Sequence, residues 1–449
     1  MNPISTWMSV GCLSVALLGV NVAAASRPPV PPIPSIPKIP QDQQKPAYSV
    51  AEYNAFQAAH NEQNATAKLK ALDDFSAKYP TPDQLTPYVY RDYYLTYYSL
   101  KNYPQTLAFV DKLLALGDKV DFGSRLEALV ARAQSYFTGS ADKALQTPEQ
   151  YTKARDSANQ GSQMLTTWQK PDNMTADQFA TQKKNIGMLF DSVGGKANSG
   201  LKDYKAAVDS YKAALALDSN DPLTHYNLGI AYLQSVPPDA LPGYWELARS
   251  IALKVPGDVQ VRAYLRNQLL HYQQPGCDKL VDDEMNQMVT LAASSPERPE
   301  TLTIPSADDL KKAQEDTANF IPWLQEGGDH GKTMWLATCG LEYPDVAVRV
   351  MEVTPGDGDN VTLKVFRAAT EEEMQAATAP NMEVHVVGQP DAKRIQKDDY
   401  VRFTGTLTAY AQSPFLLTWE NAKVNTEDIS SDKPAPGAKR PARTLPPKK

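Results

Sequence analysis

The stretch from Tyr204 to Tyr232 is the sequence feature that most constrains the fold. It reads YKAAVDSYKAALALDSNDPLTHYNLGIAY, in which apolar residues recur at helical spacing on both sides of a short polar turn that ends in Pro222. Such a helix-turn-helix unit cannot bury its apolar faces alone, so it must stack on neighbouring units. The stretch therefore predicts an array of helical hairpins, whose function is binding rather than catalysis.

Small and aromatic residues recur at matching places in the two hairpins that meet in this stretch. Glycine and alanine let two helices approach closely, and aromatic rings fill the space beside them. The first-helix places of the later hairpin hold Leu228, Gly229 and Tyr232, and the second-helix places of the earlier one hold Tyr204, Ala207, Tyr211 and Ala214. This pattern resembles the tetratricopeptide repeat (TPR), whose period is about 34 residues. The resemblance implies a superhelical array whose first helices line a concave, peptide-binding groove.

The helical pattern extends over residues 48–274, which we expect to form one TPR-like repeat domain. The predicted hairpins, separated by Pro, Gly and Asn, cover about 50–79, 87–114, 126–165, 185–221 and 222–255, with a capping helix at 261–272. A helical connector is expected at 275–340.

From residue 343 the apolar period changes from helical spacing to two. The segments VAVRVMEV, VTLKVF, EVHVV, DYVRFTGTLTAY and PFLLTWENAKV predict five strands, and TEEEMQAA predicts a short helix between them. Five short strands with one helix favour a small β-barrel over 341–427, which resembles an oligonucleotide/oligosaccharide-binding (OB) fold. The predicted fold class is therefore multidomain α + β, a TPR-like superhelical array followed by a five-stranded OB-like barrel.

Both ends of the chain have a composition unlike that of a folded domain. Residues 1–25 form an apolar run that ends in three alanines, as in a signal peptide, so we expect an exported protein, periplasmic or secreted. Residues 26–47 form a proline-rich linker, either an extended spacer or a ligand for a proline-binding groove. Residues 428–449 form a basic, proline-rich tail that we expect to be disordered. No later segment has the roughly 20 apolar residues of a membrane span.

Two cysteines, Cys277 and Cys339, remain after the predicted signal peptide with its Cys12 is removed. In an oxidising compartment they can form a disulfide. The alternative is two unrelated buried thiols.

The titratable residues favour no catalytic, metal or cofactor site. The five histidines are scattered, with no pair at metal-ligand spacing, and no Cys-x-x-Cys motif is present. The segment GDGDN is better explained as a hairpin turn than as a calcium loop. The net charge of −7 argues against nucleic-acid binding, which requires a basic face. We expect a non-enzymatic protein without a cofactor.

A tyrosine-rich segment, YVYRDYYLTYYSLKNY at 88–103, suggests where a partner binds. The TPR register puts Tyr90, Tyr93 and Tyr97 in the core. It puts on the groove side Tyr88, Arg91, Asp92, Leu95 and Tyr98, and from the fifth hairpin Tyr226, Asn227 and Ile230. Tyrosine and arginine are enriched at binding hot spots. The resemblance thus implies a scaffold or adaptor that binds a protein or peptide, unless these tyrosines pack against neighbouring helices. Together with the predicted signal peptide, it places the expected partner in the cell envelope.

An alternative function rests on the predicted barrel. Its aromatic residues could stack on sugar rings if they face outward, which would suit a binder of cell-envelope polysaccharide or peptidoglycan, or a hydrolase; they are Tyr400, Phe403, Tyr410, Phe415 and Trp419. A hydrolase also needs a pair of carboxylates in a cleft, and the sequence singles out none. Neither the partner nor the oligomeric state follows from the sequence.

Overall fold

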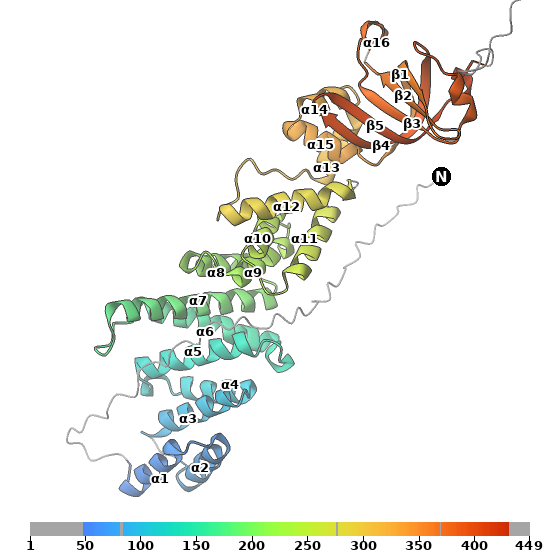
Figure 1. The fold of residues 1–449 in the computed structure, drawn as a ribbon. Coiled ribbons are helices and arrows are strands. Elements are labelled where there is room, and N and C mark those ends of the chain that lie inside the picture. Colours follow the sequence, from blue (N-terminus) through green and yellow to red (C-terminus); the bar gives the residue numbers. More distant parts are fainter. Residues whose placement is uncertain (1–47, 81–83, 275–276, 369, 431–449) are drawn as a thin grey trace, which may run out of the picture. The chain divides into compact units, whose positions relative to one another are not determined.

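The computed structural model describes residues 48–80, 84–274, 277–368 and 370–430 (Figure 1). The predicted signal peptide (1–25) and proline-rich linker (26–47) lie outside the described residues, as does the predicted tail from 431 onward. The chain divides into two compact units. Among the described residues, the first contains those up to Leu265 together with Met288–Arg298, and the second contains those of Arg266–Gln287 and those from Pro299 onward.

Helical hairpins build the first unit. The hairpins are α1 (Val50–Asn61) with α2 (Ala65–Lys78), α3 (Thr86–Ser99) with α4 (Tyr103–Leu114), α5 (Phe122–Thr138) with α6 (Pro148–Thr167), α7 (Ala176–Gly200) with α8 (Tyr204–Leu217), and α9 (Pro222–Gln234) with α10 (Ala240–Ala252). The 3₁₀ turns η1 (Gly117–Lys119) and η2 (Lys143–Leu145) flank α5, and α11 (Asp258–Tyr272) and α12 (Asp278–Ser294) follow. First helices of consecutive hairpins also touch, α3 with α5, α5 with α7 and α7 with α9. The predicted array of helical hairpins is confirmed.

The same turn ends a helix at three places in this unit. Lys101, Lys202 and Lys254 have positive φ angles of 57°, 63° and 61°. After two of these turns a polar side chain caps the next helix, Asn102 at the start of α4 and Asp203 at the start of α8. The turns at 101 and 202 share one geometry and nearly one sequence, because residues 100–103 read LKNY and residues 201–204 read LKDY.

Close packing in the fourth and fifth hairpins depends on small residues. A Cβ atom at Gly195 of α7 would lie 2.5 Å from the ring of Tyr211 in α8, and one at Gly229 of α9 would lie 2.9 Å from the carbonyl oxygen of Gly243 in α10. The expected role of glycine, to admit a neighbouring helix, therefore applies in both hairpins. In α3 the same place holds Tyr94, whose side chain is fully buried.

The segment 288–298 completes the first unit. The guanidinium of Arg249 in α10, which is 6% exposed, donates to the carbonyl oxygen of Ala292 and, over 3.0 Å, to Oδ1 of Asn220. Buried arginines need such acceptors because they stay charged. The last turns of α12 thus provide a carbonyl that α10 requires.

A closed β-barrel dominates the second unit. Its strands are β1 (Glu342–Pro355), β2 (Val361–Phe366), β3 (Met382–Val386), β4 (Tyr400–Gln412) and β5 (Phe415–Val424), in the order β1-β2-β3-β5-β4 with β4 pairing back to β1. All neighbours are antiparallel except β3 and β5, which are parallel. Helix α16 (Glu371–Ala376) lies between β2 and β3 in sequence, and the turns η3 (Pro390–Arg394) and η4 (Thr426–Asp428) follow β3 and β5. The predicted five-stranded barrel is confirmed.

Three helices before the barrel share its hydrophobic core. They are α13 (Ala307–Glu315), α14 (Phe320–Glu326) and α15 (Gly328–Thr338). Leu310, Leu324 and Met334 from these helices lie in one cluster with barrel residues such as Leu363 and Trp419. Part of the predicted connector at 275–340 therefore packs on the barrel, because α13, α14 and α15 contribute apolar residues to its core.

A disulfide joins Cys277 and Cys339, whose Cα atoms are 5.6 Å apart, within the second unit. The backbone N–H of Cys277 also donates to the carbonyl oxygen of Leu336 over 3.1 Å. The bond fixes the start of α12 to the end of α15. Among the described residues, no helix combines the length and apolarity that a membrane crossing requires.

Candidate functional site

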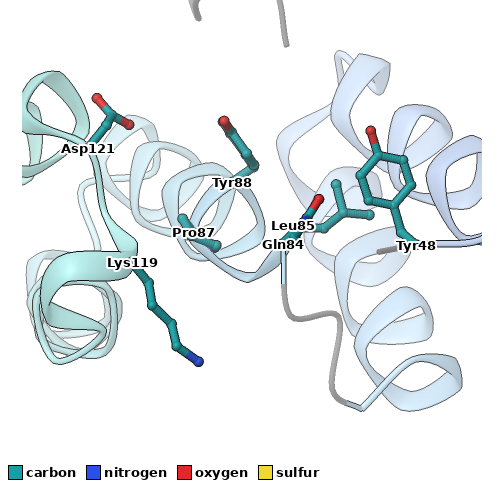
Figure 2. Close-up of a pocket in the computed structure, with 7 residues that line it drawn as sticks. All are labelled: Tyr48, Gln84, Leu85, Pro87, Tyr88, Lys119 and Asp121. Atoms are coloured by element: carbon teal, nitrogen blue, oxygen red, sulfur yellow. The ribbon is translucent and has the colours of Figure 1, made fainter. Parts of the chain in front are cut away.

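A pocket of about 470 Å³ lies at the start of three first helices in the first unit (Figure 2). Its lining comes from the residue two before α1, from the segment that enters α3, and from the segment that enters α5; the residues are Tyr48, Gln84, Leu85, Pro87, Tyr88, Lys119 and Asp121. Tyr88 is the one residue among them that the sequence nominated.

Helix-start chemistry places most of these side chains. Pro87 occupies the first turn of α3, where its missing N–H costs no hydrogen bond. Asp121 caps α5, because its Oδ1 accepts from the N–H of Ser124 over 3.0 Å. Tyr48 stacks on Tyr53 of α1 at 5.5 Å between ring centroids. The positions of Pro87, Asp121 and Tyr48 are therefore fixed by their contacts with the first turns of α3, α5 and α1.

The pocket combines an apolar surface with polar groups of both signs. Leu85 is buried and Pro87 half-buried, whereas Lys119 and Asp121 bring a cation and an anion. Burial raises the pKa of Tyr88, and nearby Asp121 and Tyr48 raise it further, so its phenol stays neutral and can donate a hydrogen bond. Figure 2 shows Tyr88 between Asp121 and Tyr48. A pocket of this kind can receive an apolar or aromatic side chain of a bound peptide, while the peptide backbone on either side forms hydrogen bonds with the polar groups.

Arg91 lies one turn after Tyr88 in α3 and is held by an internal partner. Its Nε and Nη2 donate to the two carboxylate oxygens of Glu127 in α5, each over 2.8 Å. The two side chains are only 17% and 16% exposed. This bidentate pair links consecutive first helices. Arg91 therefore holds α3 and α5 together next to the pocket.

The prediction that Asp92 lines the groove is wrong. Asp92 is 3% exposed, and its Oδ2 lies 2.7 Å from Nδ1 of His60 at the end of α1. Because α1 covers this side of α3, the side chain faces the inside of the array.

The remaining nominated residues are half-buried and do not line the pocket. Leu95 packs against the cluster around Tyr94, and the ring of Tyr98 lies edge-on to Tyr103 at 6.0 Å. Tyr226, Asn227 and Ile230 lie on α9, and burial raises the pKa of Tyr226. The pocket at the helix starts thus contains none of these α9 residues.

The predicted core tyrosines of α3 surround one phenylalanine. Phe109 of α4 has ring-centroid distances of 4.2 Å to Tyr93, 5.6 Å to Tyr97 and 6.1 Å to Tyr90. The tyrosine surplus in this hairpin is therefore partly structural, because three of its rings pack between α3 and α4.

Most pocket residues were missed from the sequence, although two carried a usable signal. Pro87 and Asp121 are helix-start residues of consecutive first helices, so the repeat register brings the two ends side by side. Tyr48, Gln84 and Lys119 lie outside the helices and have no place in that register.

Two sequence expectations concern metal ligands and the aromatic residues of the barrel. Among them, no group of three His, Cys, Asp or Glu side chains could hold a metal ion. Of the barrel aromatics, Phe403 and Trp419 are each 1% exposed, and Tyr410 packs on Trp335 at 5.0 Å. Tyr400, 44% exposed, is the one ring of the five that faces solvent.

Comparison with known proteins supports the repeat assignment. A family model described as a TPR repeat matches residues 201–235, which span α8 and α9. No curated protein and no solved structure matches the chain. A TPR repeat supports a role in protein interaction, and in this chain it lies in an array of helical hairpins followed by a closed five-stranded barrel.

Proposed function

We propose that the chain is a non-enzymatic, exported scaffold that binds a protein or peptide partner in the cell envelope. The apolar N-terminal run of the sequence supports export, and the TPR repeat supports protein binding. The helical array acts as a rigid support, and the partner contributes an extended or helical segment.

The observation that carries this proposal is the pocket at the starts of α1, α3 and α5. It combines two tyrosines with an apolar wall and a charge of each sign, and such surfaces bind peptides with a large contact area and little loss of side-chain entropy. Arg91 and Glu127 support the wall rather than contact the partner. One apolar side chain of the partner would enter the pocket, and its backbone would hydrogen-bond to Tyr88.

Site-specific photo-crosslinking tests this function. A photoreactive amino acid replaces Gln84, an exposed residue of the pocket, in the full-length chain expressed in its host. The matched control replaces Gln105, an exposed glutamine on α4 of the same hairpin. We expect one discrete adduct from position 84, none from position 105, and loss of the adduct when Tyr88→Ala is added. Equal adducts from both positions, or an adduct that persists with Tyr88→Ala, would refute peptide binding at this pocket.

Sugar binding by the barrel has weaker support. Stacking on a polysaccharide needs several exposed rings along one face, and Tyr400 alone of the five candidate aromatics is exposed. No observation favours this alternative over the pocket of the array.

A further inference from the structure

A second cavity, of about 540 Å³, lies inside the second unit where α13, α14 and α15 meet the barrel. Small-molecule sites typically have volumes of about 300–1,000 Å³. Much of the lining is apolar or aromatic and includes Phe320, Ile321, Tyr343, Phe366 and Trp419. The cavity is separate from the proposed peptide site, which belongs to the first unit.

Several polar side chains of the lining already have partners. Gln314 donates to the carbonyl oxygen of Ala337 over 3.1 Å, and Thr338 donates to that of Met334 over 2.7 Å. The side chain of Asn381 donates to the carbonyl oxygen of Arg367 and accepts from its N–H, over 2.7 and 2.9 Å. These groups require nothing from a ligand.

Two buried donors of the lining have no partner among the described residues. They are Nε1 of Trp419 and the hydroxyl of Tyr343, on rings that meet edge to face at 5.7 Å. Trp419 is 1% exposed, and burial raises the pKa of Tyr343 to about 12, so its phenol keeps its proton. Because an indole N–H can only donate, a partner for Trp419 must be an acceptor. Buried donors without a partner are rare in proteins and point to a missing ligand or water.

Arg367 adds a positive charge to the same cavity. Burial lowers the pKa of its guanidinium, and no carboxylate within the described part of the chain pairs with it. Its side-chain hydrogen bond goes from Nη1 to the carbonyl oxygen of Ala347, over 3.3 Å. The lining also contains two carboxylates, and both have partners. Exposed Glu373 accepts from the N–H of Thr370. Half-buried Asp316 accepts from the backbone N–H and the side-chain amide of Asn319, over 3.2 and 2.8 Å. Arginine stays charged at physiological pH. The half-buried guanidinium of Arg367 is therefore a cation without a counter-ion among the described residues.

We propose that this cavity binds an amphiphilic carboxylate, with the carboxylate on Arg367, the alkyl or aryl body against the aromatic lining, and an acceptor oxygen of the ligand near Tyr343 or Trp419. Three groups of the lining decide the sign of the ligand: within the part of the chain that the structure describes, Trp419 and Tyr343 are donors without a partner, and Arg367 is a cation without a counter-ion. A cationic amphiphile of the same length leaves the two donors unpaired and adds repulsion from Arg367. The net charge of −7 repels anions from the chain as a whole, so selective anion binding has to come from a local site.

Isothermal titration calorimetry of the purified full chain tests this proposal with decanoate, decanol and decylamine, each below its aggregation concentration. We expect saturable binding of decanoate, about tenfold weaker binding of decanol, and the weakest binding by decylamine. Arg367→Gln should weaken decanoate about tenfold and leave decanol unchanged. Arg394→Gln, at a partly exposed arginine outside the cavity lining, is the matched control and should bind decanoate like the parent.

Three results would overturn the proposal. They are no saturable binding of decanoate, equal affinities for the three amphiphiles, and an equal loss of decanoate affinity in the Arg367 and Arg394 variants. Circular dichroism checks that each variant is folded. Should Arg367→Gln not fold, Arg367→Lys keeps the charge and must retain the preference for decanoate over decylamine.

Discussion

Two adjacent glycines in α7 should respond in opposite ways to the same substitution. A Cβ atom at Gly194 would meet nothing closer than Oγ of Ser210 at 3.5 Å, which is ordinary contact. A Cβ atom at Gly195 would lie 2.5 and 2.6 Å from two ring atoms of Tyr211, a side chain that is 2% exposed. Because the ring is buried, it has little room to move. The structure therefore predicts a gain in stability from Gly194→Ala and a loss from Gly195→Ala.

The expected magnitudes follow from two opposing effects. Alanine is favoured over glycine within a helix by about 1 kcal/mol, which applies to both positions. Overpacking a well-filled interior costs about 1–3 kcal/mol, which applies to Gly195 alone. A contact as short as 2.5 Å belongs at the upper end of that range. We expect the free energy of unfolding to rise by about 1 kcal/mol in Gly194→Ala and to fall by about 1–2 kcal/mol in Gly195→Ala.

Hydrogen exchange measured by mass spectrometry on peptides from α7 and α8 reports the local unfolding free energy in the full chain. Tyr211→Leu provides the coupling test, because removal of the ring should abolish the cost of Gly195→Ala in the double variant. The reasoning fails if both glycine substitutions change the unfolding free energy in the same direction, or if the cost of Gly195→Ala is unchanged without the ring.

Three further predictions concern charge and covalent linkage. Burial raises the pKa of Asp191 in the folded chain to about 6, from 3.8. The contribution of its carboxyl group to stability is therefore fully present below pH 3.8 and is lost as the pH rises through 6. In thermal melts Asp191→Asn, which cannot ionise, should gain stability relative to the parent as the pH is raised from about 4 to about 7.5. Arg91→Met should lower the unfolding free energy by about 2 kcal/mol, because it leaves the carboxylate of Glu127 without its bidentate partner. Removal of the disulfide by Cys277→Ser with Cys339→Ser should cost about 2–4 kcal/mol in the second unit and leave hydrogen exchange in the first unchanged.

Matched controls make the first two of these predictions specific. Asp209→Asn, at an exposed residue of α8, should follow the parent at both pH values. Lys70→Met breaks an ion pair with Asp74 whose side chains are 77% and 69% exposed, and it should leave stability unchanged. A similar loss in Lys70→Met and Arg91→Met would show that burial of the Arg91 pair has no effect.

The elements that could be predicted from sequence are those whose signal is local. In β2, VTLKVF alternates buried and half-buried residues along its whole length, which is the pattern that its sequence shows. The helical hairpins were found for the same reason, because each contains its own period and its own turn residues. The fold class was predictable since it depends on the type and order of such elements.

Partners distant in the chain set the features that could not be predicted. Asp92 lies next to groove residues on the surface of α3, yet His60 of α1, 32 residues earlier, decides that it faces inward. The partner of Arg91 lies 36 residues later. Sequence periodicity finds an apolar face but cannot say which polar residues at its edges a neighbouring helix will cover. The cavity of the second unit escaped notice because its helices were expected to be a connector.

The carbonyl oxygen that receives Arg249 lies 43 residues downstream, in the segment 288–298. During synthesis the chain emerges from its N-terminus, so α10 is complete well before its acceptor exists. In that interval the guanidinium must stay hydrated, and the site around it cannot close. By the time Ala292 has emerged, residues 266–287 of the other unit are present as well. The end of the helical array is thus assembled late. A fragment that stops at the end of α11 would lack the carbonyl oxygen of Ala292 that accepts from Arg249.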